Sequence, residues 1–138
     1  MRCKFLLALV CLACSLPTLR AADAMDEKQF QKLMKEVGKA AKGMKDNLQA
    51  KNAAVVAKDS ARVAEIYNQM TGFWKARKAD DAVRWSRASA FAATATAAAV
   101  KTGDWEKVKL DWDGVGKNCK ACHDKHRDKL DDGSYKIK

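Results

Sequence analysis

The stretch FQKLMKEVGKAAKGMKDNL (residues 30–48) decides the fold class, because its apolar residues recur at the spacing of an α-helix. They fall at every third or fourth position and therefore share one helix face. These residues are Phe30, Leu33, Met34, Val37, Ala41, Met44 and Leu48. Lysines recur at the same period on a different face, at positions 28, 32, 35, 39, 42 and 45. The pattern predicts an amphipathic helix over residues 26–50 with a basic outer surface.

Three more helices are expected after this one. Residues 51–77 carry a second apolar seam, which includes Val63, Tyr67 and Met70. Residues 81–101 contain the run ASAFAATATAAAV, whose alanines favour a helix and allow a neighbouring backbone or a flat ligand to approach closely.

A fourth helix is expected from Trp105 to near Leu130, after a glycine stop and a new N-cap in TGD (residues 102–104). No strand-like alternation is visible, and the one proline of the chain is Pro17. Four amphipathic helices joined by short links predict an all-α, up-down-up-down antiparallel four-helix bundle.

The first residues have the pattern of a secretory signal peptide. Two basic residues precede the apolar run FLLALVCLACSL (residues 5–16), and the small-residue stretch RAADA follows it. A run of twelve residues is too short to span a bilayer. We therefore expect a signal peptide over residues 1–21, a bundle over residues 22–138, no transmembrane anchor after processing, and a periplasmic location. Cleavage before Cys14, as in a lipoprotein, is the weaker alternative.

The chain stays basic after processing. Its formal net charge is +10, and removal of residues 1–21 takes away three basic residues and no acidic ones, which leaves +7. Such a charge favours acidic proteins, nucleic acid or anionic membranes as partners. Because nucleic acid is scarce outside the cytoplasm, we expect no nucleic-acid partner. An ordinary lysine-rich solvated surface explains the same charge.

Cysteine usage points to a cofactor. Three of the five cysteines lie in the predicted signal peptide, which leaves Cys119 and Cys122 in a C-x-x-C-H motif with His123. Two thiols one helical turn apart suit covalent attachment to the two vinyl groups of a haem, and the adjacent histidine then reaches the iron. A zinc cage is disfavoured, since the remaining Cys and His residues lie within eight positions of one another. A thioredoxin-like dithiol expects an α/β context. We predict one covalently bound haem c (iron) per chain.

The sixth iron ligand is less constrained. A methionine thioether suits electron transfer, whereas an open position suits small gases. In an antiparallel bundle, Met34 and Met70 lie level with His123, while Met44 lies some 15 Å further along at 1.5 Å per residue. Geometry alone leaves Met34, Met70 and an open site as alternatives, because methionine is also a common core residue.

The segment VGKNCKACHDKHR (residues 115–127), near the end of a four-helix chain, resembles the class II cytochromes c, also called the cytochrome c′ (cytochrome c prime) family. In that family C-x-x-C-H in the last helix is usually followed three residues later by an aromatic residue and then arginine. The resemblance implies that Arg127 lies near the proximal face of the haem. His126 stands at the aromatic position, which is a departure from the family pattern.

The first helix also resembles this family, and Met34 falls at the family's distal position. Members with methionine there are low-spin, six-coordinate electron carriers, and members with Tyr, Phe or Leu there are five-coordinate and bind gases. The resemblance therefore implies Met34 as the distal iron ligand opposite His123.

Two functions follow. The first is an exported c-type cytochrome with His/Met axial ligation that acts in one-electron transfer. The alternative is a five-coordinate haem protein that binds or sequesters NO or CO, with Met34 only as a pocket wall. No catalytic Ser/His/Asp set, carboxylate pair or phosphate loop is visible, so we do not expect an enzyme.

The expected partners are redox proteins, acidic ones in particular. Four lysines near the haem tether would guide such a partner, although they also serve simple helix solubility. They are Lys117, Lys120, Lys125 and Lys129. Members of the family often pair through their first two helices, and the resemblance is therefore compatible with a homodimer.

Overall fold

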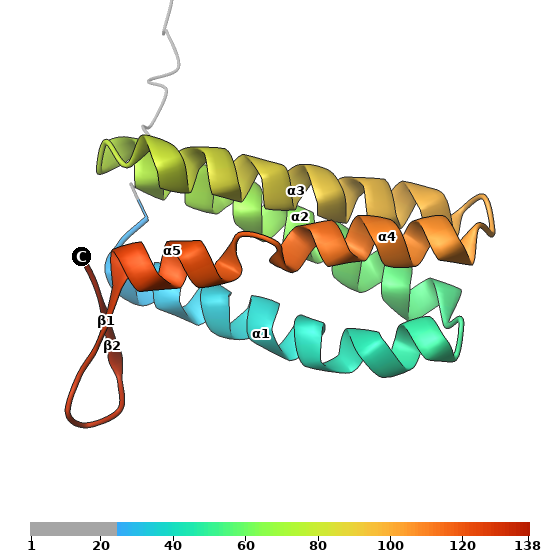
Figure 1. The fold of residues 1–138 in the computed structure, drawn as a ribbon, viewed down its shortest axis with the longest axis horizontal. Helices are drawn as coiled ribbons and strands as arrows, with labels where there is room; N and C mark the ends of the chain where they lie inside the picture. Colours follow the sequence, from blue (N-terminus) through green and yellow to red (C-terminus); the bar gives the residue numbers. More distant parts are fainter. Residues whose placement is uncertain (1–24) are drawn as a thin grey trace, which may run out of the picture.

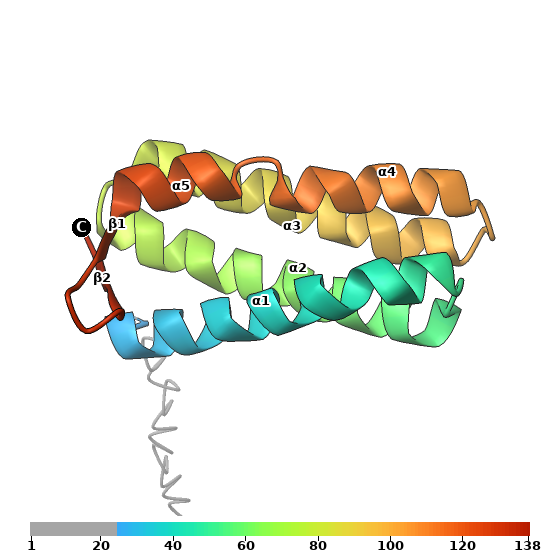
Figure 2. The same ribbon diagram turned by 60° about the horizontal axis from the view of Figure 1, so that its bottom comes forward.

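The computed structural model describes residues 25–138, so the predicted signal peptide lies outside the described residues. Four helical rods run in alternating directions (Figures 1 and 2). The first three are α1 (Glu27–Gln49), α2 (Ala53–Ala76) and α3 (Asp80–Val100), and the fourth consists of α4 (Trp105–Gly116) followed by α5 (Cys119–His126). The predicted all-α, up-down-up-down four-helix bundle is confirmed.

Side-chain caps fix where three of the helices begin. Asp26 accepts a hydrogen bond from the backbone N–H of Gln29 at 2.7 Å, and Asp104 accepts one from Lys107 at 3.0 Å. Asn52 caps α2 through a longer bond of 3.4 Å to the N–H of Val55. Each cap satisfies a backbone donor that the first helical turn leaves free. Gly103, with φ of +73°, ends the turn before α4, as the TGD stretch predicted.

The alanine-rich part of α3 packs tightly against α4. A Cβ added to Gly114 would lie only 3.1 Å from the Cβ of Ala92, which is closer than most real contacts of this kind. Ala90, Ala93 and Ala99 are buried along the same helix. The small side chains therefore bring two helix backbones together.

The prediction of one continuous fourth helix ending near Leu130 is wrong. The helix is interrupted between α4 and α5, where Gly114 and Gly116 each disfavour the helical state by roughly 1 kcal/mol relative to alanine. The N–H of Lys117 makes only a 3.4 Å bond to the carbonyl of Gly114, and a new helix then starts with a 3.0 Å bond from Cys122 N–H to Asn118 O. The C-x-x-C-H motif therefore occupies a short helix of its own.

A small β-hairpin follows α5, where the sequence suggested no strand. Its strands are β1 (Arg127–Lys129) and β2 (Tyr135–Ile137), which pair antiparallel. Strands of three residues are too short to show alternation in a sequence. The turn needs a glycine, because Gly133 has φ of +80°, and its N–H donates to Leu130 O at 2.9 Å. Figure 1 shows the hairpin leaving the end of α5 beside the start of α1.

The core consists of two clusters. The larger one lies at the hairpin end of the bundle and includes Phe30, Phe73 and Trp74, whose rings contact one another at centroid distances of 4.3 to 5.1 Å. The smaller one is centred on Met44 and Val108, both 0% exposed. Among the described helices, none is both long and apolar enough to cross a membrane.

Candidate functional site

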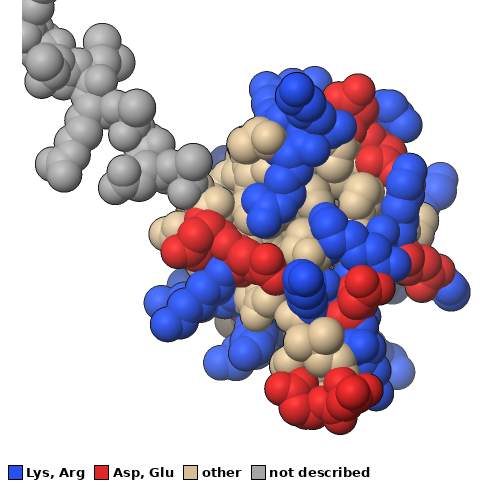
Figure 3. Space-filling view, turned by 90° about the vertical axis from the view of Figure 1, so that its left-hand side faces the viewer, with Lys and Arg blue, Asp and Glu red and all other residues tan. Residues whose placement is uncertain are grey.

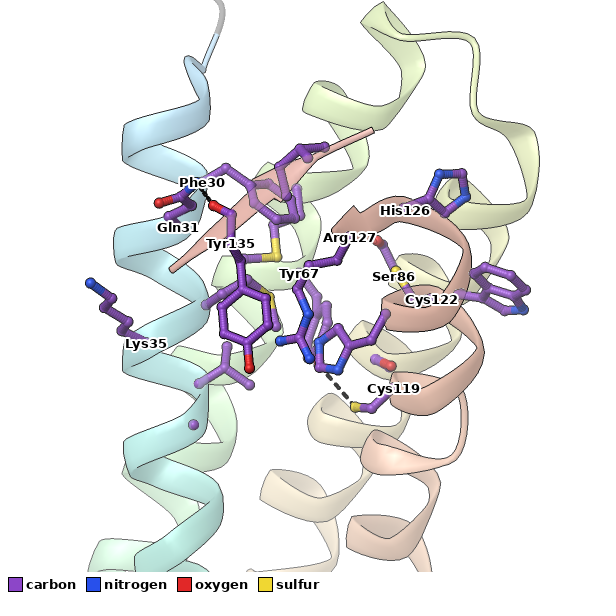
Figure 4. A pocket seen from close by; sticks show the side chains of 18 of the residues that line it. Phe30, Gln31, Lys35, Tyr67, Ser86, Cys119, Cys122, His126, Arg127 and Tyr135 are labelled. Carbon is purple, nitrogen blue, oxygen red and sulfur yellow. Dashed lines mark hydrogen bonds between the residues drawn. The ribbon is translucent and has the colours of Figure 1, made fainter. Parts of the chain in front are cut away.

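A cavity of about 570 Å³ lies at the hairpin end of the bundle, lined by residues of α1, α2, α3, α5 and the hairpin and open on one side. Figure 4 shows α1 and α5 facing each other across it. Its wall is mostly apolar, and its volume falls within the roughly 300–1,000 Å³ that is usual for ligand and cofactor sites. The larger core cluster borders this space, and the smaller one lies at the other end of the bundle.

The C-x-x-C-H residues contribute the α5 side of this cavity. Cys119, Cys122 and His123 all line it, and each is partly buried. The two cysteines are not joined in a disulfide. One helical turn therefore presents two free thiols and one imidazole to the same space.

Burial sets the protonation of these groups. Desolvation, followed by the neighbouring Cys119 and Asp81, raises the pKa of the Cys122 thiol to about 11, so this group is a neutral thiol at pH 7. Burial and then the positive charge of Arg127 lower the pKa of His123. The imidazole is therefore held in its neutral form, which is the form that ligates a metal.

Methionines line the cavity from two other helices. Met34 of α1 and Met70 of α2 are both wall residues, whereas Met44 belongs to the smaller core cluster at the other end. This placement agrees with the positions along the bundle axis that counting residues gave for the three methionines. Met34 is partly exposed, and Met70 is 1% exposed.

Tyr67 is a site residue that the sequence placed only in a packing seam. Its hydroxyl lies 3.9 Å from the sulfur of Cys119, and the side chain is buried beside the cavity (Figure 4). Burial, followed by the charge of Cys119, raises the pKa of Tyr67 well above its ordinary value, so the phenol keeps its proton. The only available signal was general: the polar tip of a buried tyrosine usually has a partner.

His126 lines the cavity from the last turn of α5. Its Nε2 lies 3.0 Å from Asp81 Oδ1, and its ring centroid lies 4.9 Å from Trp74 and 6.1 Å from Trp85. Lys125 Nζ lies 2.7 Å from the other oxygen of Asp81. The hydrogen bond from Lys125 is the main reason that the pKa of Asp81 falls well below its ordinary range. The His126 ring thus packs between two tryptophan rings, and Asp81 fixes its orientation.

Arg127 lies where α5 gives way to β1. It lines the cavity, and its guanidinium carbon sits 3.9 Å from the centroid of the Tyr135 ring. Figure 4 shows the pair at the mouth of the cavity between α1 and α5. The positive charge of Arg127 adds to burial in lowering the pKa of His123.

The family model described as Cytochrome C′ matches residues 23–127. The chain belongs to the cytochrome c′ family. It is therefore a c-type haem protein, with haem c bound covalently, and its family acts in electron transfer or gas binding. No curated protein and no solved structure gives a significant match. Residues 128–138, which include most of the hairpin, lie beyond the matched segment.

The described residues fit this cofactor. A porphyrin needs a deep apolar space, and covalent attachment needs two thiols at one edge of it, which Cys119 and Cys122 supply. His123 offers a neutral imidazole from the same turn. Within residues 25–138, no three Cys, His, Asp or Glu side chains are grouped closely enough to hold a metal ion directly. The donor set is thus one that suits an iron porphyrin better than a bare metal ion.

Proposed function

We propose that this cytochrome c′ family member is an exported one-electron carrier, with His123 and Met34 as the axial ligands of its haem. The observation that carries the proposal is that Met34 on α1 and His123 on α5 line one cavity from helices that face each other across it. Haem supplies a centre that gains or loses one electron, and a thioether ligand suits electron transfer.

Each group of the chain has a role in this proposal. Cys119 and Cys122 tether the haem through thioether bonds, one haem per chain. His123 stays neutral and binds the iron, and the apolar wall keeps water away from it. Tyr67, which remains protonated, packs against the tether sulfur. In this proposal the protein carries electrons and is not an enzyme.

The basic surface supports an acidic redox partner. The four lysines near the haem tether, however, contribute less unpaired positive charge to this surface than the lysines of α1 do. Lys120 pairs with Asp124, and Lys125 pairs with Asp81, so two of those four charges have an acidic neighbour. Figure 3 shows the hairpin end of the bundle, where Lys and Arg side chains are interspersed with acidic ones.

Among the described residues, the positive charges of the lysine stripe on α1 are not paired with acidic side chains. Its six lysines are all exposed, and within residues 25–138 none of them forms an ion pair. They are Lys28, Lys32, Lys35, Lys39, Lys42 and Lys45. They span about 25 Å at 1.5 Å per residue. Because Lys35 also lines the cavity, this stripe leads to the cofactor site, and we propose it as the main docking surface.

The remaining parts of the proposal concern location and assembly. We propose cleavage after residue 21 and a periplasmic mature protein, and N-terminal sequencing of protein purified from the periplasm tests both. We include a homodimer in the proposal because members of the cytochrome c′ family are often dimeric. Sedimentation equilibrium of the holoprotein tests it.

Absorption spectra of the matured holoprotein, oxidised and reduced, test the ligation. We expect a low-spin spectrum in the wild type, high-spin character in Met34→Ala, and a low-spin spectrum in the matched control Met70→Ala. A high-spin wild type, or a Met34→Ala spectrum identical to that of the wild type, contradicts Met34 ligation.

The gas-binding alternative stands beside this proposal because the family acts in electron transfer or gas binding. In this alternative the reduced wild-type protein binds CO rapidly without displacing a ligand, and Met34→Ala leaves the rate of CO binding unchanged.

A further inference from the structure

The C-terminal hairpin contributes to the cavity although most of it lies beyond the segment that matches the family. The match ends at Arg127, yet Gly133, Ser134, Tyr135 and Ile137 all line the cavity. In Figure 4 Tyr135 lies between α1 and α5, at the open side of the space. This chain therefore has a wall for which the family pattern does not account.

Hydrogen bonds fasten the hairpin to helices on both sides of the cavity. On the α1 side, Gln31 Nε2 donates to Tyr135 O at 2.9 Å, and Ile137 N–H donates to Glu27 Oε1 at 2.9 Å. On the α5 side, Lys138 N–H donates to His126 O at 3.1 Å. The hairpin thus bridges the two helices that are proposed to hold the axial ligands.

Side-chain packing adds to these bonds. The Tyr135 ring stacks under the Arg127 guanidinium at 3.9 Å, and Ile137 packs against the larger core cluster. A two-stranded hairpin is marginally stable by itself in water. The hydrogen bonds to α1 and the packing of Ile137 against the larger core cluster therefore account for its order, and the stack of Tyr135 on Arg127 holds the two strands together.

We propose that the hairpin is an added outer wall of the haem site, in which Tyr135 and Ile137 limit how closely solvent and small molecules approach the cofactor. The proposal rests on haem occupying the cavity and does not depend on the identity of the sixth ligand. Shielding from water lowers the local dielectric constant and thereby helps to set the reduction potential. Tyr135 and Ile137 are positioning residues in this scheme, since neither is an iron ligand.

The experiment compares the matured holoprotein with the double variant Tyr135→Ala/Ile137→Ala. Both substitutions are neutral, so the charge of the molecule does not change. Leu130→Ala is the matched control, because Leu130 is an apolar residue of the same hairpin that is 43% exposed and does not line the cavity.

Two readouts are measured, the reduction potential and the second-order rate constants of electron exchange with hexacyanoferrate(III) and with hexaammineruthenium(II). We expect the double variant to exchange electrons about threefold faster or more with both reagents, and to show a shifted potential, because exposure of the cofactor tunes both. Leu130→Ala is expected to match the wild type. The two reagents carry opposite charges. A loss of shielding speeds up both reactions, whereas a change in electrostatic attraction would speed up one and slow the other.

Rates and potential equal to those of Leu130→Ala overturn the proposal. A second measurement guards against a double variant that fails to fold. Hydrogen exchange of the wild-type holoprotein is expected to show protected amides at Ile137 and Lys138, and exchange at the rate of an unstructured peptide overturns the proposal without any variant. A high-spin wild-type spectrum would refute only the Met34 ligation and leave both tests of the hairpin intact.

Discussion

Replacement of Met44 by alanine is expected to weaken the bundle without affecting the haem. Met44 is 0% exposed and lies in the smaller core cluster with Leu48, Val56, Ala99 and Val108. The change removes three methylene-sized groups, which at roughly 0.8 kcal/mol each amounts to about 2.4 kcal/mol of lost transfer free energy. A residual cavity adds to this cost, since such changes in protein cores range over roughly 2–5 kcal/mol. We expect a loss of about 3 kcal/mol in the free energy of unfolding.

Urea unfolding of the matured holoprotein, followed by far-ultraviolet circular dichroism, measures this loss. A parallel thermal scan is expected to show a Tm lower by about 12 °C for a domain of this size. The haem absorption spectrum is expected to stay that of the wild type, because Met44 does not line the cavity. Met44→Leu is the matched control and is expected to cost less than about 1.5 kcal/mol, since it conserves volume.

Two results would refute this reasoning. A loss below about 1 kcal/mol would mean that the smaller cluster is not a packed core, because fully buried methionines do not give such small values. A change in spin state on Met44→Ala would mean that the two ends of the bundle are not independent, and that Met44 acts on the iron.

Three other perturbations have defined outcomes. Asp81→Asn is expected to lower the Tm by about 5 °C at pH 7, since it loses a charge-assisted hydrogen bond. Because the folded-state pKa of Asp81 is depressed, that difference is complete above about pH 5 and shrinks as the pH falls toward the folded-state pKa, which Tm measurements from pH 7 to pH 3 check. Ser60→Ala is expected to leave stability unchanged or to raise it by up to about 1 kcal/mol in urea unfolding, because the buried Ser60 hydroxyl has no hydrogen-bond partner among the described residues; a clear loss would reveal a hidden partner. Lys35→Glu/Lys39→Glu is expected to slow reduction by an anionic reagent at low salt more than Lys117→Glu/Lys120→Glu does, although both variants reverse two charges, with the difference vanishing at high salt in stopped-flow traces; equal effects would exclude α1 as the main docking surface.

Most of the helices could be predicted from the sequence, because each has apolar residues at helical spacing and a recognisable first residue. The stripe of α1 and the glycine-aspartate pair before α4 gave their positions to within a few residues. The break at Lys117 was missed, since the apolar spacing continues across it from Val115 to Cys119. Glycines at 114 and 116 were the available signal, and of the two only Gly114 lies in the tight contact of α4 with α3.

The site was predictable where one motif carries the chemistry, and less so where residues far apart in sequence meet. The spacing of Cys119, Cys122 and His123 identifies the motif in the sequence. The positions of Met34 and Met70 along the bundle axis follow from the rise per residue of a helix. The contact of Tyr67 with Cys119 and the hairpin wall arise from tertiary packing, for which no local pattern exists. Their roles as ligands and walls remain predictions for the spectra and rates described above.

The interruption between α4 and α5 separates the support of the two helices. α4 is held against α3 at the 3.1 Å approach of Gly114, whereas Lys117 and Asn118 form a joint with one long hydrogen bond. No continuous ladder of helical hydrogen bonds therefore fixes the direction of α5 relative to α4. The contacts of Asp81 with His126 and Lys125, at 3.0 Å and 2.7 Å, hold the segment that bears the two thiols against α3 instead.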